Sequence, residues 1–210
     1  MSIILNKLKT DFFSNVNLEL KSNEKIAIVG QNGSGKTTLL RTILGLNKSE
    51  GDINIFGDNL KSKDDFKKIY SKIGYLFQDS DDSFIASSVI DEVAFNLYNQ
   101  NDDYENSYKK AEQLLEEFGI SNLKDKLPIK LSGGEKRIVA ICACLIHNPN
   151  ILFLDEPTNH LDKDMALILE KKLKEYEGNI ILIAHNIDFA KKIVDKFYKL
   201  EAIGLTEIEI

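Results

Sequence analysis

Residues 30–37 have the types and spacing needed to hold the phosphates of a nucleotide. They read Gly-Gln-Asn-Gly-Ser-Gly-Lys-Thr. Glycines let backbone N–H groups approach phosphate oxygens closely, because no Cβ stands between them. Lys36 can reach the β- and γ-phosphates, and the Thr37 hydroxyl is a suitable ligand for Mg²⁺. We name residues 30–37 the phosphate loop. The nucleotide contacts expected in and just after it are Gly30, Gln31, Asn32, Gly33, Ser34, Gly35, Lys36, Thr37 and Thr38.

The segments that flank the phosphate loop have the pattern that such a loop requires. Residues 25–29 form a short apolar run that is typical of a buried strand. Residues 38–44 have the apolar spacing of a helix, which Gly45 can end. A helix that begins near Lys36 directs the positive end of its dipole at the phosphates. This strand–loop–helix order disfavours the alternative, a glycine turn that binds nothing.

Two acids follow a second buried strand, which is expected at residues 151–154. Asp155 can hold Mg²⁺ through water, and Glu156 can polarise an attacking water as a general base. Acid pairs after strands are also common as turn or N-cap residues. A phosphate loop in the same chain favours the catalytic interpretation.

Ser132, Gly133 and Gly134 form a second candidate anion site. They open the most apolar helix of the chain, which is expected to run to about residue 147. The N–H groups of a helix N-terminus are free to bind an anion, and these residues carry no bulky side chains. The alternative is an ordinary helix N-cap by Ser132.

Two further polar residues stand at the ends of expected strands. Gln78 follows residues 73–77, and its neutral amide can reach Mg²⁺ and the attacking water. His185 follows residues 180–184 and can hydrogen-bond the γ-phosphate or orient Glu156. The alternatives are a plain polar strand end and a half-buried structural histidine. The predicted catalytic residues are Glu156, His185 and Gln78, and the predicted metal ligands are Thr37, Gln78 and Asp155.

The composition is that of a globular protein, with 43% hydrophobic and 29% charged residues among 210. The net charge of −6 disfavours a broad nucleic-acid surface, which needs clustered Lys and Arg. The longest apolar run, 138–146, is shorter than the roughly 17–25 residues that span a bilayer. With no secretion signal at the start, we expect membrane association only through a partner. Cys142 and Cys144 are expected to be small apolar residues of a buried helix rather than a metal clip or a disulfide.

The order of the expected elements predicts one α/β domain over residues 1–210. Strands are expected at 3–5, 16–20, 25–29, 51–57, 73–77, 151–154 and 180–184, helices at 38–44, 61–70, 89–97, 108–118, 132–147, 163–176 and 187–194, and a closing hairpin at 197–210. Alternating buried strands and helices predict a mostly parallel sheet. The early strands add a small antiparallel β subdomain. We expect the core at about 1–78 and 150–210, and a helical subdomain at about 79–149.

These motifs, in this order, resemble those of the nucleotide-binding subunits of ABC transporters. Residues 131–135, Leu-Ser-Gly-Gly-Glu, are similar to the family signature Leu-Ser-Gly-Gly-Gln. The phosphate loop, Gln78, Asp155-Glu156, Leu161-Asp162 and His185 stand in the order of the other family motifs, so the resemblance covers essentially the whole chain.

The resemblance implies a P-loop ABC fold and an ATPase that uses ATP and Mg²⁺. It also implies a head-to-tail dimer with a second ATPase subunit, which is either the same chain or a paralogue. In such a dimer, residues 132–134 bind the γ-phosphate of the ATP that the other subunit holds. Asp162 would contact the opposite subunit near its nucleotide, cap the helix from residue 163, or do both.

The chain departs from the family pattern at three places. Glu135 replaces the usual glutamine, and we expect it either to weaken ATP-dependent closure a little or to pair with a Lys or Arg of the partner. His160 stands where a small residue is common. The aromatic residue that stacks on adenine is not obvious, because Phe12 is the nearest candidate while Phe12 and Phe13 can both fill the core.

Residues 78–84 and 91–95 resemble more particularly the ATPases of energy-coupling-factor transporters, especially the cobalt/nickel branch. This resemblance implies an importer of a metal ion or a vitamin. It places the chain on integral membrane subunits at the cytoplasmic face of the cell membrane. Family members receive the coupling helix of the membrane subunit in this region. The acidic loop at 79–83 can also be a solvated turn.

Two alternatives come from other classes of protein. A soluble ABC-type ATPase that acts mechanically on nucleic acid or ribosomes usually has coiled-coil insertions, tandem domains or basic surfaces. This compact, acidic chain does not fit that description, so we expect no nucleic-acid partner. A P-loop small-molecule kinase would share only the phosphate loop and has no use for residues 131–135.

Overall fold

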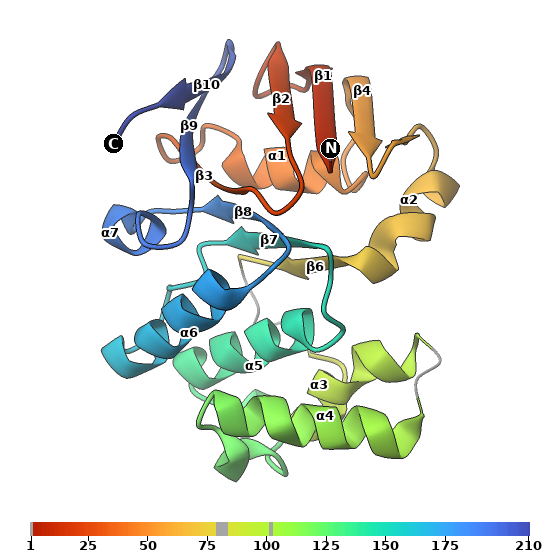
Figure 1. Cartoon of the computed structure of the whole chain (residues 1–210), viewed down its shortest axis with the longest axis vertical. Coiled ribbons are helices and arrows are strands. Elements are labelled where there is room, and N and C mark those ends of the chain that lie inside the picture. The colour runs from red at the N-terminus through yellow and green to blue at the C-terminus, as the bar shows by residue number, and fades with distance from the viewer. Residues whose placement is uncertain (1, 79–83, 101–102) are drawn as a thin grey trace.

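The computed structural model describes residues 2–78, 84–100 and 103–210, which form two β-sheets and their covering helices (Figure 1). The acidic loop considered above, 79–83, lies outside the described residues. No helix in the described part of the chain is long and apolar enough to span a membrane. The predicted α/β class, with a mostly parallel sheet, a small antiparallel sheet and a group of helices, is confirmed.

The main sheet has six strands in the order β10-β9-β3-β8-β7-β6. They are β3 (Lys25–Val29), β6 (Ile73–Leu76), β7 (Ile151–Asp155), β8 (Asn179–Ile183), β9 (Lys196–Glu201) and β10 (Gly204–Ile208). The neighbouring strands from β9 through β3, β8 and β7 to β6 are all parallel, and β10 pairs with β9 as an antiparallel hairpin at the edge of the sheet. Every residue of β7 and β8 is buried, because helices or a second sheet cover both faces. The parallel strands therefore end at one common edge, where the polar motifs follow.

The second sheet is antiparallel and has the order β2-β1-β4-β5. Its strands are β1 (Ile3–Lys9), β2 (Val16–Leu20), β4 (Glu50–Ile55) and β5 (Asp58–Asn59). Figure 1 shows helix α1 (Lys36–Ile43) between this sheet and the main one. Leu39, Leu40 and Ile43 of α1 share one hydrophobic cluster with residues of both sheets. This packing fixes α1, and with it the phosphate loop that precedes it.

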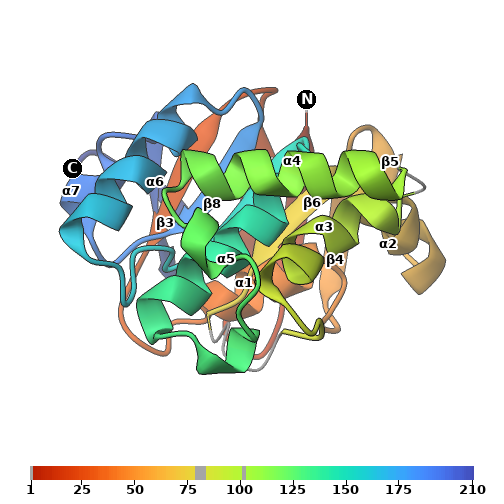
Figure 2. The same cartoon turned by 90° about the horizontal axis from the view of Figure 1, so that it is seen from below.

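Helices cover the other face of the main sheet. They are α3 (Val89–Tyr98), α4 (Tyr104–Glu117), α5 (Gly133–Leu145) and α6 (Lys163–Glu175), and they share a second hydrophobic cluster with the sheet. Figure 2, seen from below, shows α4 as the outermost of them, and α4 packs on α3 and α5. Helix α5 contacts both β6 and the outer helices, so it links them to the sheet. Helix α2 (Lys63–Ile69) lies between β5 and β6 in the chain.

Several expected elements have different bounds in the structure. The helix expected at 108–118 begins four residues earlier, as α4 (Tyr104–Glu117). The first strand runs to Lys9, through an irregular register between Leu5 and Leu8. The strand expected at 51–57 ends at Ile55, where the chain turns into β5. The helix expected at 187–194 is α-helical only at α7 (Ile187–Ala190). Hydrogen-bonded turns follow α7 as far as Val194, and then the backbone N–H and a carboxylate oxygen of Asp195 pair with the backbone of Lys25, which returns the chain to the sheet.

Candidate nucleotide site

The phosphate loop joins the end of β3 to the start of α1. At Gly35, with φ 93°, a Cβ atom would lie 2.7 Å from the Cβ of Phe12, so only glycine fits there without displacing its neighbour. The ammonium of Lys36 folds back over the loop and donates to the carbonyl oxygens of Gly30 and Gln31, each at 2.9 Å. Lys36 is therefore held at the loop, and phosphate oxygens can replace these carbonyls as acceptors.

Thr37, Asp155 and Gln78 meet at the start of α1. The Thr37 hydroxyl donates to Oδ2 of Asp155 at 2.7 Å and lies 3.4 Å from Oε1 of Gln78. Asp155 is fully buried, and its Oδ1 atom has no hydrogen-bond partner among the described residues. Burial raises the pKa of Asp155, while the hydrogen bond from Thr37 opposes that rise. A hydroxyl, an amide oxygen and a carboxylate with a free oxygen fit a small, hard divalent cation.

Glu156 is held through both of its carboxylate oxygens. Oε1 lies 2.7 Å from Nε2 of His185, and Oε2 accepts a hydrogen bond of 2.6 Å from the Asn159 side chain. The backbone N–H of Glu156 bonds the Ile183 carbonyl at 3.1 Å, across the ends of β7 and β8. Glu156 also has a φ of 51°, a left-handed conformation that is uncommon for a residue with a side chain. This arrangement fixes a carboxylate where it can receive a proton.

A pocket of about 380 Å³ brings most of the predicted site residues together. Its lining comes from five separate stretches of the chain: Phe12, Asn32, Gly33, Gly35, Lys36, Thr37, Thr38, Gln78, Glu156 and His185. Phe12 is 49% exposed at this pocket, whereas Phe13 is 2% exposed and belongs to the hydrophobic cluster between the sheets. Of the two aromatic candidates, only Phe12 can therefore face a nucleotide base.

Gln31 and Ser34 of the phosphate loop border a neighbouring cavity of about 320 Å³ rather than this pocket. Gly30 contributes through the carbonyl that accepts from Lys36.

Ser132, Gly133 and Gly134 do not line the pocket beside the phosphate loop, as far as the described residues show. Ser132 caps α5 together with Glu135. The Ser132 hydroxyl accepts from the Glu135 backbone at 3.3 Å, and the Glu135 carboxylate accepts from the Ser132 backbone at 2.8 Å. Gly134 packs closely on the loop that contains His160. A Cβ atom at position 134 would lie only 2.6 Å from the carbonyl oxygen of His160.

Arg137 is a functional candidate that the sequence analysis missed. It is 1% exposed, and its guanidinium donates to the backbone carbonyls of Phe77, Gln78, Asp155 and Glu156. The available signal was a pair of basic residues, Lys136 and Arg137, in the first turns of the most apolar helix of the chain. Asn159, the partner of Glu156, was missed as well.

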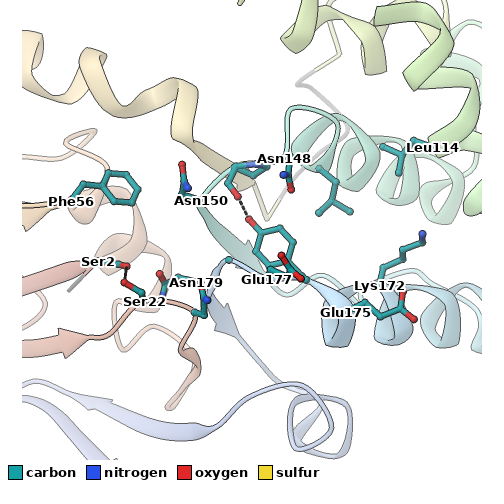
Figure 3. Close-up of a pocket in the computed structure, with 15 residues that line it drawn as sticks. Ser2, Ser22, Phe56, Leu114, Asn148, Asn150, Lys172, Glu175, Glu177 and Asn179 are labelled. Atoms are coloured by element: carbon teal, nitrogen blue, oxygen red, sulfur yellow. Dashed lines mark hydrogen bonds between the residues drawn. The ribbon is translucent and has the colours of Figure 1, made fainter. Parts of the chain in front are cut away.

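A larger cavity, of about 740 Å³, lies at the other ends of the strands (Figure 3). Its lining includes Ser2, Asn148, Asn150 and Asn179, and Ser2 and Ser22 share a hydrogen bond of 3.4 Å there. Among the described residues, none of the predicted site residues lines it. It is therefore separate from the pocket beside the phosphate loop.

The fold and the site define a P-loop nucleotide hydrolase: a glycine-rich loop between a buried strand and a helix, with acids at the end of a neighbouring parallel strand. The chain belongs to the ABC transporter family, whose pattern matches residues 13–159. The resemblance seen in the motifs is thereby confirmed, and the chain is an ABC transporter ATPase that binds ATP.

Two relatives have informative names. A provisionally named ABC transporter ATP-binding protein of Brucella suis is 38% identical over 186 residues, covering 86% of this chain and 76% of that protein. The energy-coupling factor transporter ATP-binding protein EcfA1 of Streptococcus sanguinis is 38% identical over 180 residues, covering 83% of this chain and 64% of EcfA1.

Two solved structures share the fold. The ATP-binding cassette MJ0796, a dimer in a post-hydrolysis state with ADP and Pi, has a TM-score of 0.87 and 27% identity, covering 99% of this chain and 98% of that one. CbiO1 of Clostridium perfringens, part of the ABC transporter complex CbiONQ, has a TM-score of 0.83 and 30% identity, covering 97% of this chain and 86% of that one.

Proposed function

We propose that this chain is the ATP-hydrolysing subunit of an energy-coupling-factor-type importer of a metal ion or a vitamin. The importer class is supported by the 38% identity to EcfA1 and by the fold shared with CbiO1, together with the resemblance of residues 78–95. The hydrolytic chemistry rests on one observation: Glu156 lines the pocket of the phosphate loop and is held there by His185 and Asn159.

The pocket residues divide the work of ATP hydrolysis among them. Backbone N–H groups of the phosphate loop and the Lys36 ammonium bind the phosphates, and Phe12 stacks on the base. Thr37, Asp155 and Gln78 would hold Mg²⁺, which neutralises phosphate charge when it is bound. Glu156 accepts the proton of the attacking water, and His185 orients that carboxylate. The products are ADP and inorganic phosphate.

The site is completed by a second ATPase subunit, which is a copy of this chain or a paralogue. Residues 132–134 of one subunit bind the γ-phosphate of ATP on the phosphate loop of the other. Two observations support this split site. The described lining of the phosphate-loop pocket contains none of these three residues, and the related cassette MJ0796 was solved as a dimer.

The membrane subunit docks beside Gln78, so that the chain sits on the cytoplasmic face of the cell membrane. Exposed apolar side chains flank Gln78 in the chain: Phe77 just before it, Ile85 after it, and Phe95 and Tyr98 on α3. Phe77 is covalently next to Gln78, so movement of a docked helix would reach the nucleotide site directly.

Purification from native membranes tests the transporter assignment. The tagged chain should recover integral membrane subunits, whose identification names the importer. Replacing Phe95 and Tyr98 together by serine should lower that recovery roughly tenfold, as expected for central apolar contacts. Leu167→Ser on α6, at another exposed apolar residue, is the matched control and should not change it. Recovery of ribosomes or nucleic acid in place of membrane subunits would overturn the proposal.

Sedimentation with ATP and Mg²⁺ tests the split site, using the chain alone and the complex recovered from membranes. Glu156→Gln should stop turnover and accumulate an ATP-bound dimer of ATPase subunits. Adding Ser132→Arg should abolish that dimer and leave ATP binding by each subunit intact. Dimers that persist with Ser132→Arg would give residues 132–134 another role.

A further inference from the structure

We infer that Arg137 is the positioning residue that ties the N-terminal end of α5 to the backbone carrying Gln78 and Glu156. Its side chain is buried against the ends of β6 and β7. Nη1 donates to the carbonyls of Phe77 at 2.6 Å and Gln78 at 3.0 Å. Nη2 donates to the carbonyl of Glu156 at 2.8 Å and also to that of Asp155.

The chemistry of the contact requires a guanidinium. One planar group with donors pointing in several directions can serve two strand ends at once. A lysine ammonium at the same place is a point donor on a flexible stem and cannot span both pairs of carbonyls in a fixed fork. Removing the side chain would leave four backbone carbonyls without this donor, that of Asp155 at a buried position, where β6 and β7 lead into the proposed catalytic segments.

Arg137 also stands close to the proposed partner-facing residues. It lies three positions after Gly134, about 4.5 Å along the axis of α5, which is one unbroken helix from Gly133 to Leu145. A shift of residues 132–134 is therefore carried by the helix to Arg137 and then to Gln78 and Glu156. Arg137 reaches neither residue's reacting atoms, so it acts by positioning them. This inference rests on the function proposed above for Glu156 and for residues 132–134.

The expected consequence is a selective loss of turnover. Arg137 does not line the pocket beside the phosphate loop within the described part of the chain, so ATP binding should persist without it. Misplacing a reacting group by about 1 Å costs on the order of 10²-fold in rate. We therefore expect Arg137→Ala to lower kcat roughly 10–100-fold and to leave the KM for ATP within about twofold of the parent.

The matched control is Ile141→Ala, one turn further along α5. Ile141 is fully buried, and its apolar side chain has no donor for the carbonyls at 77, 78, 155 or 156. Both variants should lower Tm, and both are assayed well below it. Only Arg137→Ala should lose kcat, and methylguanidinium should restore part of it. Methylammonium at equal ionic strength should not. If Arg137→Ala does not accumulate in folded form, Arg137→Lys enters the same assays and should show the same loss of kcat.

Three results would overturn the inference. The first is a kcat of the Arg137 variant no lower than that of Ile141→Ala, and the second is a rise in KM that accounts for the loss of activity. The third is equal rescue by methylguanidinium and methylammonium. Glu156→Gln is assayed in parallel, so that a failure of the proposed function can be distinguished from a failure of the role of Arg137. If that variant keeps its turnover, the proposed function fails. If it is inactive while Arg137→Ala behaves like Ile141→Ala, only the role of Arg137 fails.

Discussion

The Nε2 atom of His185 lies 2.7 Å from Oε1 of Glu156, at the ends of two neighbouring parallel strands. Asn159 binds the second carboxylate oxygen at 2.6 Å. Both oxygens are thus fixed by side chains of the protein itself, which would lower the reorganisation needed in the proposed proton transfer to this carboxylate. Since Glu156 has an uncommon positive φ, these two contacts also hold it in that conformation.

Asn159→Ala should lower kcat for ATP hydrolysis roughly 10–100-fold. The change removes one hydrogen bond to a charged group, which contributes about 1.5–3 kcal/mol. The KM for ATP should stay the same, because Asn159 is not among the described residues that line the pocket. Steady-state phosphate release measures both constants. A variant with the parental kcat would show that His185 alone orients Glu156.

Phe12→Ala and Phe13→Ala should affect different properties, although the two residues are adjacent: the first ATP binding, the second the stability of the fold. Phe12 is exposed at the pocket, and loss of base stacking of about 1–3 kcal/mol should weaken ATP binding roughly 5–150-fold. Phe13 is buried between the sheets, so its loss should destabilise the fold by about 3–5 kcal/mol. Calorimetric titration with ATP and urea unfolding separate the two. Unchanged ATP affinity in Phe12→Ala would reject the stacking role.

Glu135→Gln should strengthen ATP-dependent dimerisation about 2–5-fold. The backbone N–H of Ser132 holds the pKa of Glu135 below its usual value, so the side chain is charged at neutral pH next to the proposed γ-phosphate site. Glutamine keeps an acceptor for that N–H and removes the charge, an effect of about 0.3–1 kcal/mol at a helix end. Sedimentation in the Glu156→Gln background measures it.

The Lys126 ammonium lies 3.6 Å from the other oxygen of Glu135, which offers a matched control. Lys126→Gln should weaken the dimer, because it leaves the carboxylate without its nearby cation. The same direction of change in both variants would contradict the electrostatic explanation.

His147→Gln should flatten the dependence of stability on pH between about pH 7 and pH 5. Burial lowers the pKa of His147, and its Nε2 atom lies 3.1 Å from the Ile73 carbonyl, so it is the donor there. Because the folded pKa is below the unfolded one, the unfolded chain binds more protons. Stability is full above the unfolded pKa and falls as pH drops through it, by up to about 1.4 kcal/mol per pH unit. Urea unfolding across this range measures the slope. The exposed His160→Gln is the control, and equal slopes in His147→Gln and the parent would reject the prediction.

The phosphate loop and the acids after β7 could be proposed from the sequence, because their residues are consecutive and stand beside strongly apolar strands. Arg137 could not, since its acceptors are backbone carbonyls 59–60 and 18–19 positions away, which only the packing of α5 on β6 and β7 brings within reach. Phe12 and Phe13 are alike in sequence, and only the tertiary packing decides which faces the core. Residues 187–194 have a helical pattern, but only residues 187–190 are α-helical, and turns lead from there to Asp195, which pairs with Lys25 of β3.

The contact of Gly134 with the His160 carbonyl has a consequence for how two nucleotides would influence one another. His160 lies four positions after Glu156, and Gly134 belongs to the segment proposed to touch the other subunit's ATP. Within one protomer, a few tightly packed residues therefore connect Gly134, proposed to touch the other subunit's ATP, with Glu156, proposed to act on the protomer's own ATP. Hydrolysis at the two sites of a dimer should accordingly be cooperative, with occupancy of one altering the rate at the other.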